Sequence, residues 1–550
     1  MKKRHPHKSN VLLVNITRLG DMLQATPTIA GMKQENSNCK ITVLVEKQFE
    51  SVCHWIPNID EVLSLDLGMT VRSLTREGDG IADAFEYIDD TVADLRRRNF
   101  DYCLNMSSSA YTALLLRLVG VERNGGWRAD PEGYRIIESD WARLFATSVF
   151  HQNRQYNSLN LVDMFRCSAD VEDHPEKLLI KVTEESRAYC RNMLAEAGFT
   201  NTGPLVALQA GASQAKRQWA PAKFVRFIKV MIEEHNARVV LSGSKKELEI
   251  INRIKSCIDS PNAFVVAGQT DIPQLAALLE MSDILVTGDT GPMHMSVAVG
   301  TPVIAMFLAS AYGFETGPYS AGNIILQPVI GCGPCNPNKP CARPDCHDMI
   351  GPDLLAALTV LRLREDFKSL PAGLADPAKV LVYRSDFDRY GFCDLYPLNT
   401  EGDEHMPYRR AYRRLWLDEL GDYFENGQAM SERIACWSEV PESLRALQSV
   451  IERAQAGCWQ IERLIEIIKD PAVPAAELGR CNEALAEIDR DIEQLGFYNG
   501  PLSPLTRMFI FAKENLLGTE ALELASQMRQ AYQALIRRSG KYVNYYLNTT

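Results

Sequence analysis

The feature that most constrains the fold of this 550-residue chain is an alternation of apolar strands and helices that occurs twice. Near the start, the continuous apolar run VLLVNI (11–16) is typical of a strand buried on both faces, and KITVLVE (40–46) follows the same pattern. After the Gly/Pro-rich break GFTNTGP (198–204), the alternation restarts with LVALQAGA (205–212). Such alternation predicts parallel sheets covered by helices on both faces. We therefore expect two Rossmann-like, doubly wound α/β units, with a ligand cleft between them.

A third part of the chain has a different pattern. The segment KVLVYRSDFDRYGFCDLYPL (379–398) predicts a hairpin, and the sequence after it is helical. Two stretches, 444–454 and 485–495, each place apolar residues on one helix face, with Gly496 at an expected C-cap. These faces must be buried on the core, on each other or on a second chain, and we favour a helical layer that supports a homo-oligomer. The expected domains are 1–190, 191–363 and 364–550.

Composition excludes several function classes. Hydrophobic residues make up 46% and charged residues 23%, as in a soluble globular protein, and the net charge of −11 argues against nucleic-acid binding. The uncharged stretch 295–314 has the length of a membrane span, but Gly300-Thr301-Pro302 splits it, which favours a short helix followed by a buried strand. The N-terminal apolar run is too short for a secretory signal. We expect a cytoplasmic protein without a transmembrane segment.

One basic, aromatic segment, YRRAYRRLW (408–416), allows two interpretations. It is a helix that meets an anionic acceptor or makes a peripheral membrane contact, or it is a helix with a solvated charged face. Since Lys and Arg are mostly exposed in proteins, we favour the solvated face.

Four of the fourteen cysteines are clustered in CGPCNPNKPCARPDC. This C-x2-C-x5-C-x4-C spacing is typical of a tetrahedral thiolate site for zinc or iron, and disulfides are disfavoured in the cytosol. The alternative is four loop thiols without a metal. Because the cluster is far in sequence from Asp21, a further candidate site residue considered below, we expect any metal to be structural. The four candidate ligands are Cys332, Cys335, Cys341 and Cys346.

Three segments carry the candidate active-site chemistry. In NITRLGDML, Asp21 follows a glycine between the first strand and the next helix, where it caps the helix or takes part in the chemistry of the site. In LQAGASQAKRQWAPAKF, the cations Lys216 and Arg217 follow a strand end. In TGDTGPMHMSVAVG, Thr290 and Gly291 present N–H groups at a helix start, which favours binding of an anion.

Taken together, these three segments resemble glycosyltransferase family 9, the ADP-heptose-dependent heptosyltransferases of bacterial surface glycan synthesis. The cysteine cluster looks like the cysteine-rich loop that many members carry after the last core strand. The resemblance covers roughly the first two thirds of the chain. It implies a GT-B fold, in which the two Rossmann-like domains, acceptor-side and nucleotide-sugar-binding, face each other across a cleft. It also implies inverting transfer of a heptose from an ADP-sugar to an acceptor hydroxyl, without a catalytic metal.

The resemblance assigns roles to individual residues. Asp21 is the expected general base, and Lys216 or Arg217 is the expected partner of the leaving diphosphate. A helix N-terminus stabilises a carboxylate and so weakens it as a base, which burial in the cleft has to offset. The expected donor-binding residues are Ser213, Gly243, Asp289, Thr290, Gly291 and His294.

Other functions stay open from sequence alone. A non-catalytic GT-B-like assembly or binding protein would use the helical extension, and a redox protein would use the four cysteines as an iron centre. Neither α/β unit opens with a G-x-G-x-x-G fingerprint, which disfavours a dinucleotide enzyme. The sequence does not name the acceptor, which is lipopolysaccharide core, another glycan or a protein hydroxyl, and it does not prove that the sugar is a heptose.

Overall fold

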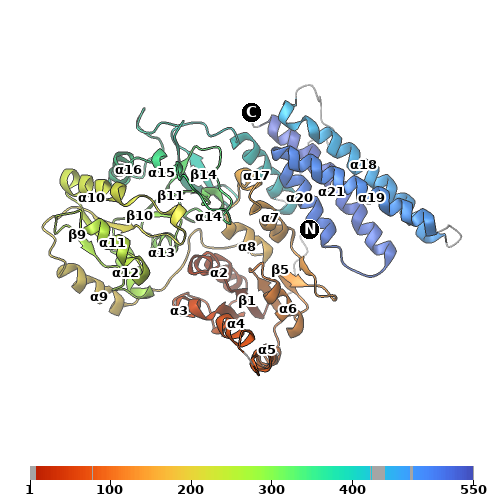
Figure 1. Ribbon diagram of the computed structural model, residues 1–550, viewed down its shortest axis with the longest axis horizontal. Coiled ribbons are helices and arrows are strands. Elements are labelled where there is room, and N and C mark those ends of the chain that lie inside the picture. Colours follow the sequence, from red (N-terminus) through yellow and green to blue (C-terminus); the bar gives the residue numbers. More distant parts are fainter. Residues whose placement is uncertain (1–7, 77, 422, 424–439, 471–474, 549–550) are drawn as a thin grey trace. The chain divides into compact units, whose positions relative to one another are not determined.

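The computed structural model describes residues 8–76, 78–421, 423, 440–470 and 475–548 (Figure 1). They form two compact units. The larger unit contains the residues up to 135 together with 159–403, and the smaller unit contains 136–158 and the residues from 404 onward. Segment 136–158 folds with the C-terminal helices, and the domain boundaries expected at 190 and 363 stay predictions.

The first sheet has six strands in the order β3-β2-β1-β4-β5-β6. Its central strand β1 pairs in parallel with β2 on one side and β4 on the other, and five of its six residues are buried. The strands are β1 (Asn10–Asn15), β2 (Lys40–Glu46), β3 (Glu61–Leu65), β4 (Tyr102–Asn105), β5 (Asn124–Ala129) and β6 (Arg135–Ile137). The helices of this domain are α1 (Leu19–Gln24), α2 (Thr26–Glu35), α3 (Glu50–Cys53), α4 (Leu67–Leu74), α5 (Gly80–Arg97), α6 (Ala110–Val119) and α8 (Leu161–Ser168).

The helix expected after the first strand is two helices. The first, α1, begins at Leu19, and its C-cap residue is Ala25. The second, α2, carries Pro27 in its first turn, where the missing N–H of proline has no intrahelical partner to lose. The short α1 therefore ends where the proline-led helix begins, and Asp21 lies in the first turn of α1.

The second sheet has eight strands in the order β14-β13-β12-β11-β10-β7-β8-β9. The predicted hairpin forms, but it extends this sheet, because β13 pairs antiparallel with β12 and β14 with β13. The strands are β7 (Leu205–Gln209), β8 (Arg238–Ser242), β9 (Ala263–Val265), β10 (Ile284–Gly288), β11 (Val303–Met306), β12 (Ile324–Pro328), β13 (Val380–Phe387) and β14 (Cys393–Pro397). The helices are α9 (Glu184–Ala195), α10 (Pro221–His235), α11 (Leu248–Lys255), α12 (Ile272–Glu280), α13 (Gly291–Val299), α14 (Gly313–Thr316), α15 (Cys346–Met349) and α16 (Pro352–Arg364).

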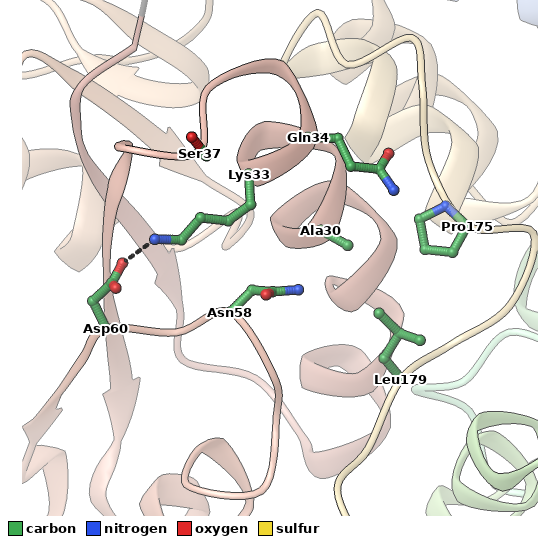
Figure 2. Close-up of a pocket in the computed structure, with 8 residues that line it drawn as sticks. All are labelled: Ala30, Lys33, Gln34, Ser37, Asn58, Asp60, Pro175 and Leu179. Carbon is green, nitrogen blue, oxygen red and sulfur yellow. Dashed lines mark hydrogen bonds and ion pairs between the residues drawn. The ribbon is translucent and has the colours of Figure 1, made fainter.

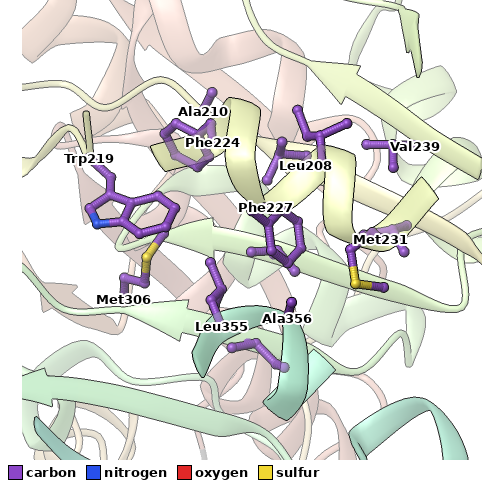
Figure 3. Packing of buried hydrophobic residues seen from close by; sticks show 14 of the residues in the cluster. Leu208, Ala210, Trp219, Phe224, Phe227, Met231, Val239, Met306, Leu355 and Ala356 are labelled. Atoms are coloured by element: carbon purple, nitrogen blue, oxygen red, sulfur yellow. The ribbon is translucent and has the colours of Figure 1, made fainter. Parts of the chain in front are cut away.

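The core of the second domain lies between this sheet and the helices α10, α11 and α16. Figure 3 shows Phe227 and Met231 of α10 above the strands, with Leu355 of α16 beside them. Trp219 is 1% exposed and packs edge-on against Phe224, so the segment leading into α10 is fixed to the core. This packing holds the loop after β7 in place, which matters because that loop carries Lys216 and Arg217.

The uncharged stretch 295–314 is confirmed as a helix followed by a strand. Helix α13 ends at Val299, Gly300 takes the left-handed conformation that terminates helices (φ +86°), and the buried strand β11 begins at Val303. In the described part of the chain, no helix is both long enough and apolar enough to span a membrane.

The smaller unit is helical. Helix α18 packs along α19 and α21, and its residues Leu444, Leu447 and Val450 are fully buried, as the periodicity predicts. The C-cap predicted at Gly496 is wrong, because α19 continues through it to Tyr498 and the glycine makes room for Thr506. The helices are α7 (Asp140–Ser148), α17 (Met406–Gly421), α18 (Glu442–Lys469), α19 (Ala475–Tyr498), α20 (Ser503–Glu514) and α21 (Ala521–Leu547).

The solvated face favoured for segment 408–416 is also wrong. Arg409 is 1% exposed and Arg413 is 6% exposed in α17. Their guanidinium groups donate to the backbone carbonyls of Gln155 and Ser158, at 3.0 and 2.6 Å. These arginines hold segment 136–158 against α17, and so they do not support the membrane-surface interpretation of the segment.

Candidate functional site

The predicted site residues lie where each sheet reverses its strand order. In the first sheet, β1 is followed by β2 on one side and has β4 on the other, and α1 with Asp21 comes directly after β1. In the second sheet, β7 and β10 are neighbours at the corresponding point. The loop after β7 carries Arg217, and the loop after β10 leads into α13. Ligands of doubly wound sheets bind at such switch points, beyond the carboxyl ends of the strands.

The first turns of α1 and α13 touch through two glycines. A Cβ atom on Gly20 would lie 2.9 Å from Cδ2 of His294, and a Cβ atom on Gly291 would lie 2.9 Å from Cδ2 of Leu19. Both distances are shorter than ordinary carbon contacts. Each glycine therefore permits a close contact between the two helices that a side chain would obstruct. The contact brings Asp21 of the first domain next to the first turn of α13 in the second domain.

Asp21 is a half-buried residue and lies at the third position of α1, not at its N-cap. Its Oδ2 accepts the backbone N–H of Arg18 at 3.1 Å, which is the reach-back half of a capping box. Burial raises the pKa of Asp21 above its usual value of 3.8, against the opposing effects of a Thr17 hydrogen bond and the charges of His294 and Arg18. The carboxylate is thus more basic than an exposed aspartate, as a general base requires.

His294 lies in the first turn of α13 and is 4% exposed. Burial lowers its pKa below the usual 6.5, although the charges of Asp289 and Asp21 oppose the change. Within the described residues, its buried Nδ1 has no hydrogen-bond partner. A buried polar atom without a partner at the meeting point of two domains is a candidate ligand contact.

Arg217 is held by two contacts. Its Nη1 forms an ion pair with Oδ2 of Asp289 at 3.0 Å, and its Nε donates to the buried hydroxyl of Ser310 at 2.9 Å. The other carboxylate oxygen of Asp289 accepts from Thr316 at 3.3 Å. Both charged side chains are largely buried, at 15% and 13% exposure, so the guanidinium is fixed beside the start of α13.

Lys216 has a different environment. Its Nζ donates to three backbone carbonyls of the cysteine-rich loop (residues 332–346), those of Asn336, Pro337 and Lys339, at 3.0, 2.9 and 2.8 Å. An ammonium group has three protons, and these contacts use all of them. Of the two adjacent cations, the structure therefore places Arg217 beside Asp289 and Lys216 on the loop.

The remaining predicted donor residues surround the same strand ends. Thr290 is the N-cap of α13, and Ser213 is exposed in the loop after β7. Gly243 follows β8, where a Cβ atom would lie 2.5 Å from Ile251, so helix packing explains this glycine.

Two residues at the site were missed by the sequence analysis. Glu247 packs over the turn after β7, where a Cβ atom on Gly211 would lie 1.5 Å from its Oε1. Its other oxygen accepts from the backbone and hydroxyl of Ser244, both at 2.7 Å. The S-x-x-E capping-box pattern was a local signal for this residue. Ser310 gave no local signal, because its role depends on contact with a side chain 93 positions away.

Burial raises the pKa of Cys335 to about 11, and the neighbouring thiols of Cys332, Cys346 and Cys341 add to the rise. Only Cys346 is buried. Among the residues that the structure describes, no three histidine, cysteine, aspartate or glutamate side chains are gathered closely enough to hold a metal ion. The donor set matches a zinc or iron thiolate site in chemistry, but the thiols are not closed around a common centre.

A separate hollow of about 610 Å³ lies on the first domain, beside α2 (Figure 2). Lys33 and Asp60 form an ion pair of 2.7 Å at its edge, and Ala30 and Leu179 supply apolar wall. None of the predicted site residues lines it.

Comparisons with known proteins agree with this geometry. Residues 91–344 match the family model for glycosyltransferase family 9 (heptosyltransferase). The chain is 25% identical over 299 residues to lipopolysaccharide heptosyltransferase 3 of Escherichia coli, covering 54% of this chain and 82% of that protein. It is 22% identical over 335 residues to lipopolysaccharide heptosyltransferase 2 of Salmonella typhimurium, covering 58% and 88%.

The fold is also that of a solved structure. A glycosyl transferase family 9 protein from Veillonella parvula matches with a TM-score of 0.52 and 18% identity, over 66% of this chain and 99% of the other. At this identity the match concerns the fold alone. Together with the two sheets described above, it confirms the predicted GT-B fold.

Proposed function

Because the chain belongs to glycosyltransferase family 9, we propose that it transfers a heptose or related sugar, with inversion, from an ADP-sugar to an acceptor hydroxyl. The proposed acceptor is a bacterial surface glycan such as lipopolysaccharide core, in line with the names of the relatives. A protein hydroxyl is the alternative acceptor. The enzyme class is glycosyltransferase in either case.

The observation that carries the proposal is the contact between α1 and α13. It places a carboxylate of raised pKa, Asp21, beside a helix N-terminus that is suited to an anion. In the proposed reaction, Asp21 takes the proton of the acceptor hydroxyl while the acceptor oxygen forms a bond to the anomeric carbon. The bond between that carbon and the diphosphate oxygen breaks, and its electron pair leaves with ADP.

The donor side supplies the charge that this step needs. Arg217 and the backbone N–H groups at the start of α13 are the proposed partners of the diphosphate, which gains negative charge as the bond breaks. Asp289, oriented by Arg217 and Thr316, is the proposed acceptor of sugar hydroxyl protons. The carboxylate of Glu247, in the 3₁₀ turn that follows β8, suits the ribose hydroxyls of a nucleotide.

We also propose that the four cysteines hold one structural zinc or iron ion. The support is their spacing, their proximity around Cys335 and the anchoring of their loop by Lys216. The ion has no part in the transfer step as written. Self-association through the helical extension stays a prediction.

The first experiment tests the donor. The purified chain is incubated with ADP-heptose, and the bound nucleotide is identified by mass spectrometry. Transfer is then measured as ADP release with a lipopolysaccharide acceptor lacking outer heptoses, and separately with a protein acceptor. Failure of ADP-heptose to bind would contradict the proposed donor, and binding without transfer to either acceptor would favour the non-catalytic alternative.

The second experiment tests the base with Asp21→Asn. Turnover should fall by on the order of a hundredfold or more, since asparagine takes no proton. The melting temperature should stay equal or rise slightly, because a carboxyl whose pKa is raised on folding loses stability as pH rises through that pKa. The matched control is Asp66→Asn: Asp66 caps α4 by accepting the N–H of Met69, and asparagine caps equally well. Retention of most of the transfer rate in Asp21→Asn would show that Asp21 only caps its helix.

A further inference from the structure

The cysteine-rich loop reaches Arg217 from two directions, and the first is through Lys216. The three loop carbonyls of Asn336, Pro337 and Lys339 converge on the Lys216 ammonium. The backbone carbonyl of Lys216 is in turn 2.9 Å from Nε2 of His347, at the start of α15. The residue directly before Arg217 is therefore tied to the loop by its side chain, and its backbone is tied to His347, the residue that follows the loop.

The second direction is through Ala309. The backbone N–H of Cys335 donates to the carbonyl of Ala309 at 2.9 Å. Ala309 has a positive φ of 54°, a conformation that a non-glycine residue adopts only when its surroundings enforce it. The next residue is Ser310, whose buried hydroxyl accepts the Nε proton of Arg217. The loop thus fixes the partner of Arg217 as well as its neighbour.

A third set of contacts keeps the loop end against α10. The indole N–H of Trp219 donates to the carbonyl of His347 at 3.2 Å, and the ammonium of Lys223 donates to the same carbonyl. Lys223 also pairs with Asp348 at 2.7 Å. Since Trp219 is buried in the domain core, these contacts pack the loop end and the segment carrying Arg217 on the same core.

We propose that the cysteine-rich loop is a positioning element for Arg217, with Lys216 and Ser310 as the positioning residues. The contacts with Ser310 and Asp289 engage two of the five guanidinium N–H groups and set the plane in which the others meet phosphate oxygens. The loop acts on donor affinity and leaves the proton transfer at Asp21 unchanged. The inference rests on the proposed role of Arg217 as a partner of the donor diphosphate.

The test uses the full chain and ADP as the probe. In Lys216→Met the three hydrogen bonds to the loop are lost while the aliphatic stem is kept, and we expect the Kd for ADP, measured by isothermal titration calorimetry, to rise about tenfold. The KM for the donor should rise with it, and kcat at saturating donor should fall severalfold, because Arg217 also meets the charge that the diphosphate gains as the bond breaks. The matched control is Lys339→Met, the same change on an exposed side chain of the loop, whose backbone carbonyl remains available; its Kd should equal that of the wild type.

A double-mutant cycle separates positioning from direct phosphate binding. If Lys216 acts through Arg217, Lys216→Met should cause no further loss of ADP affinity when it is combined with Arg217→Met. A further tenfold loss in that background would mean that Lys216 contacts the phosphate itself, and it would overturn the proposal. So would an unchanged Kd in Lys216→Met.

Two further measurements separate a folding failure of Lys216→Met and a wrong donor from a wrong positioning proposal. If Lys216→Met does not fold, Ser310→Ala removes the other support of Arg217 with a smaller change, and a severalfold rise in the Kd for ADP is expected. An unchanged Kd in Ser310→Ala would then overturn the proposal. If the wild-type chain binds no ADP, the proposed donor is contradicted. If the wild type and the Lys216→Met variant bind ADP equally, the donor stands and the positioning proposal is overturned.

Discussion

Gly20→Ala tests whether the contact between α1 and α13 is needed for catalysis. The added methyl group would lie 2.9 Å from Cδ2 of His294, whereas two carbon atoms in contact prefer about 3.5–4.0 Å. One of the two helices therefore has to move by about 0.6–1.1 Å. Displacements of this size cost up to about a hundredfold in rate when they separate reacting groups. We expect kcat to fall by about ten- to a hundredfold.

The effect on stability should be small, because two terms oppose each other. Alanine is favoured over glycine inside a helix by about 1 kcal/mol, and overpacking costs about 1–3 kcal/mol. The matched control is Gly479→Ala in α19, where the structure leaves open space around the added methyl group, so that only the helix-favouring term remains. That variant should be slightly more stable and fully active.

A second comparison concerns the activity lost in Gly20→Ala and in Gly291→Ala. The methyl group of Gly291→Ala would meet the tip of the flexible Leu19 side chain, which can rotate away, whereas the buried His294 ring has less freedom. Gly20→Ala should therefore lose more activity than Gly291→Ala in the same transfer assay. Full activity of Gly20→Ala at an unchanged melting temperature would refute the reasoning, because the working enzyme would then not need this approach.

Two further predictions concern protonation and metal content. Since Asp21 acts only when deprotonated and burial raises its pKa, kcat/KM should fall with decreasing pH at a midpoint above 3.8. The residual activity of Asp21→Asn should not show this acidic fall. An acidic fall that persists in the variant would belong to the titration of another group. Elemental analysis of protein purified without chelator should find about one zinc or iron per chain, and less than about a tenth of an equivalent would contradict the proposed thiolate site.

The sequence was sufficient for features that depend on local pattern. Apolar runs such as 11–16 and 205–209 became the parallel strands β1 and β7, because a strand buried on both faces needs apolar residues at every position. The same local logic placed Thr290 at the start of α13 and split the uncharged stretch at Gly300. The candidate site residues follow strand ends, and strand ends can be recognised without knowing the fold.

Features that depend on distant contacts were not accessible. Segment 136–158 folds with helices that begin more than 240 positions later, and its carbonyls are the reason why Arg409 and Arg413 are buried. A basic helix looks the same in sequence whether its guanidinium groups meet water or backbone carbonyls. Gly496 likewise reads as a helix end, although it serves packing against Thr506 of another helix.

The two adjacent cations Lys216 and Arg217 show how the same limit applies inside the site. From the sequence alone, either cation was an equally good candidate for the partner of the diphosphate, since both carry a positive charge. The structure separates them because the 3₁₀ turn over Ala215–Arg217 directs successive side chains to different partners, one to three carbonyls and the other to Asp289. The three carbonyls use all three protons of the Lys216 ammonium. The Arg217 guanidinium uses two of its five N–H donors, so the others remain available to a second anion. The division of roles follows from donor geometry, and it makes Arg217 the better partner for a leaving diphosphate.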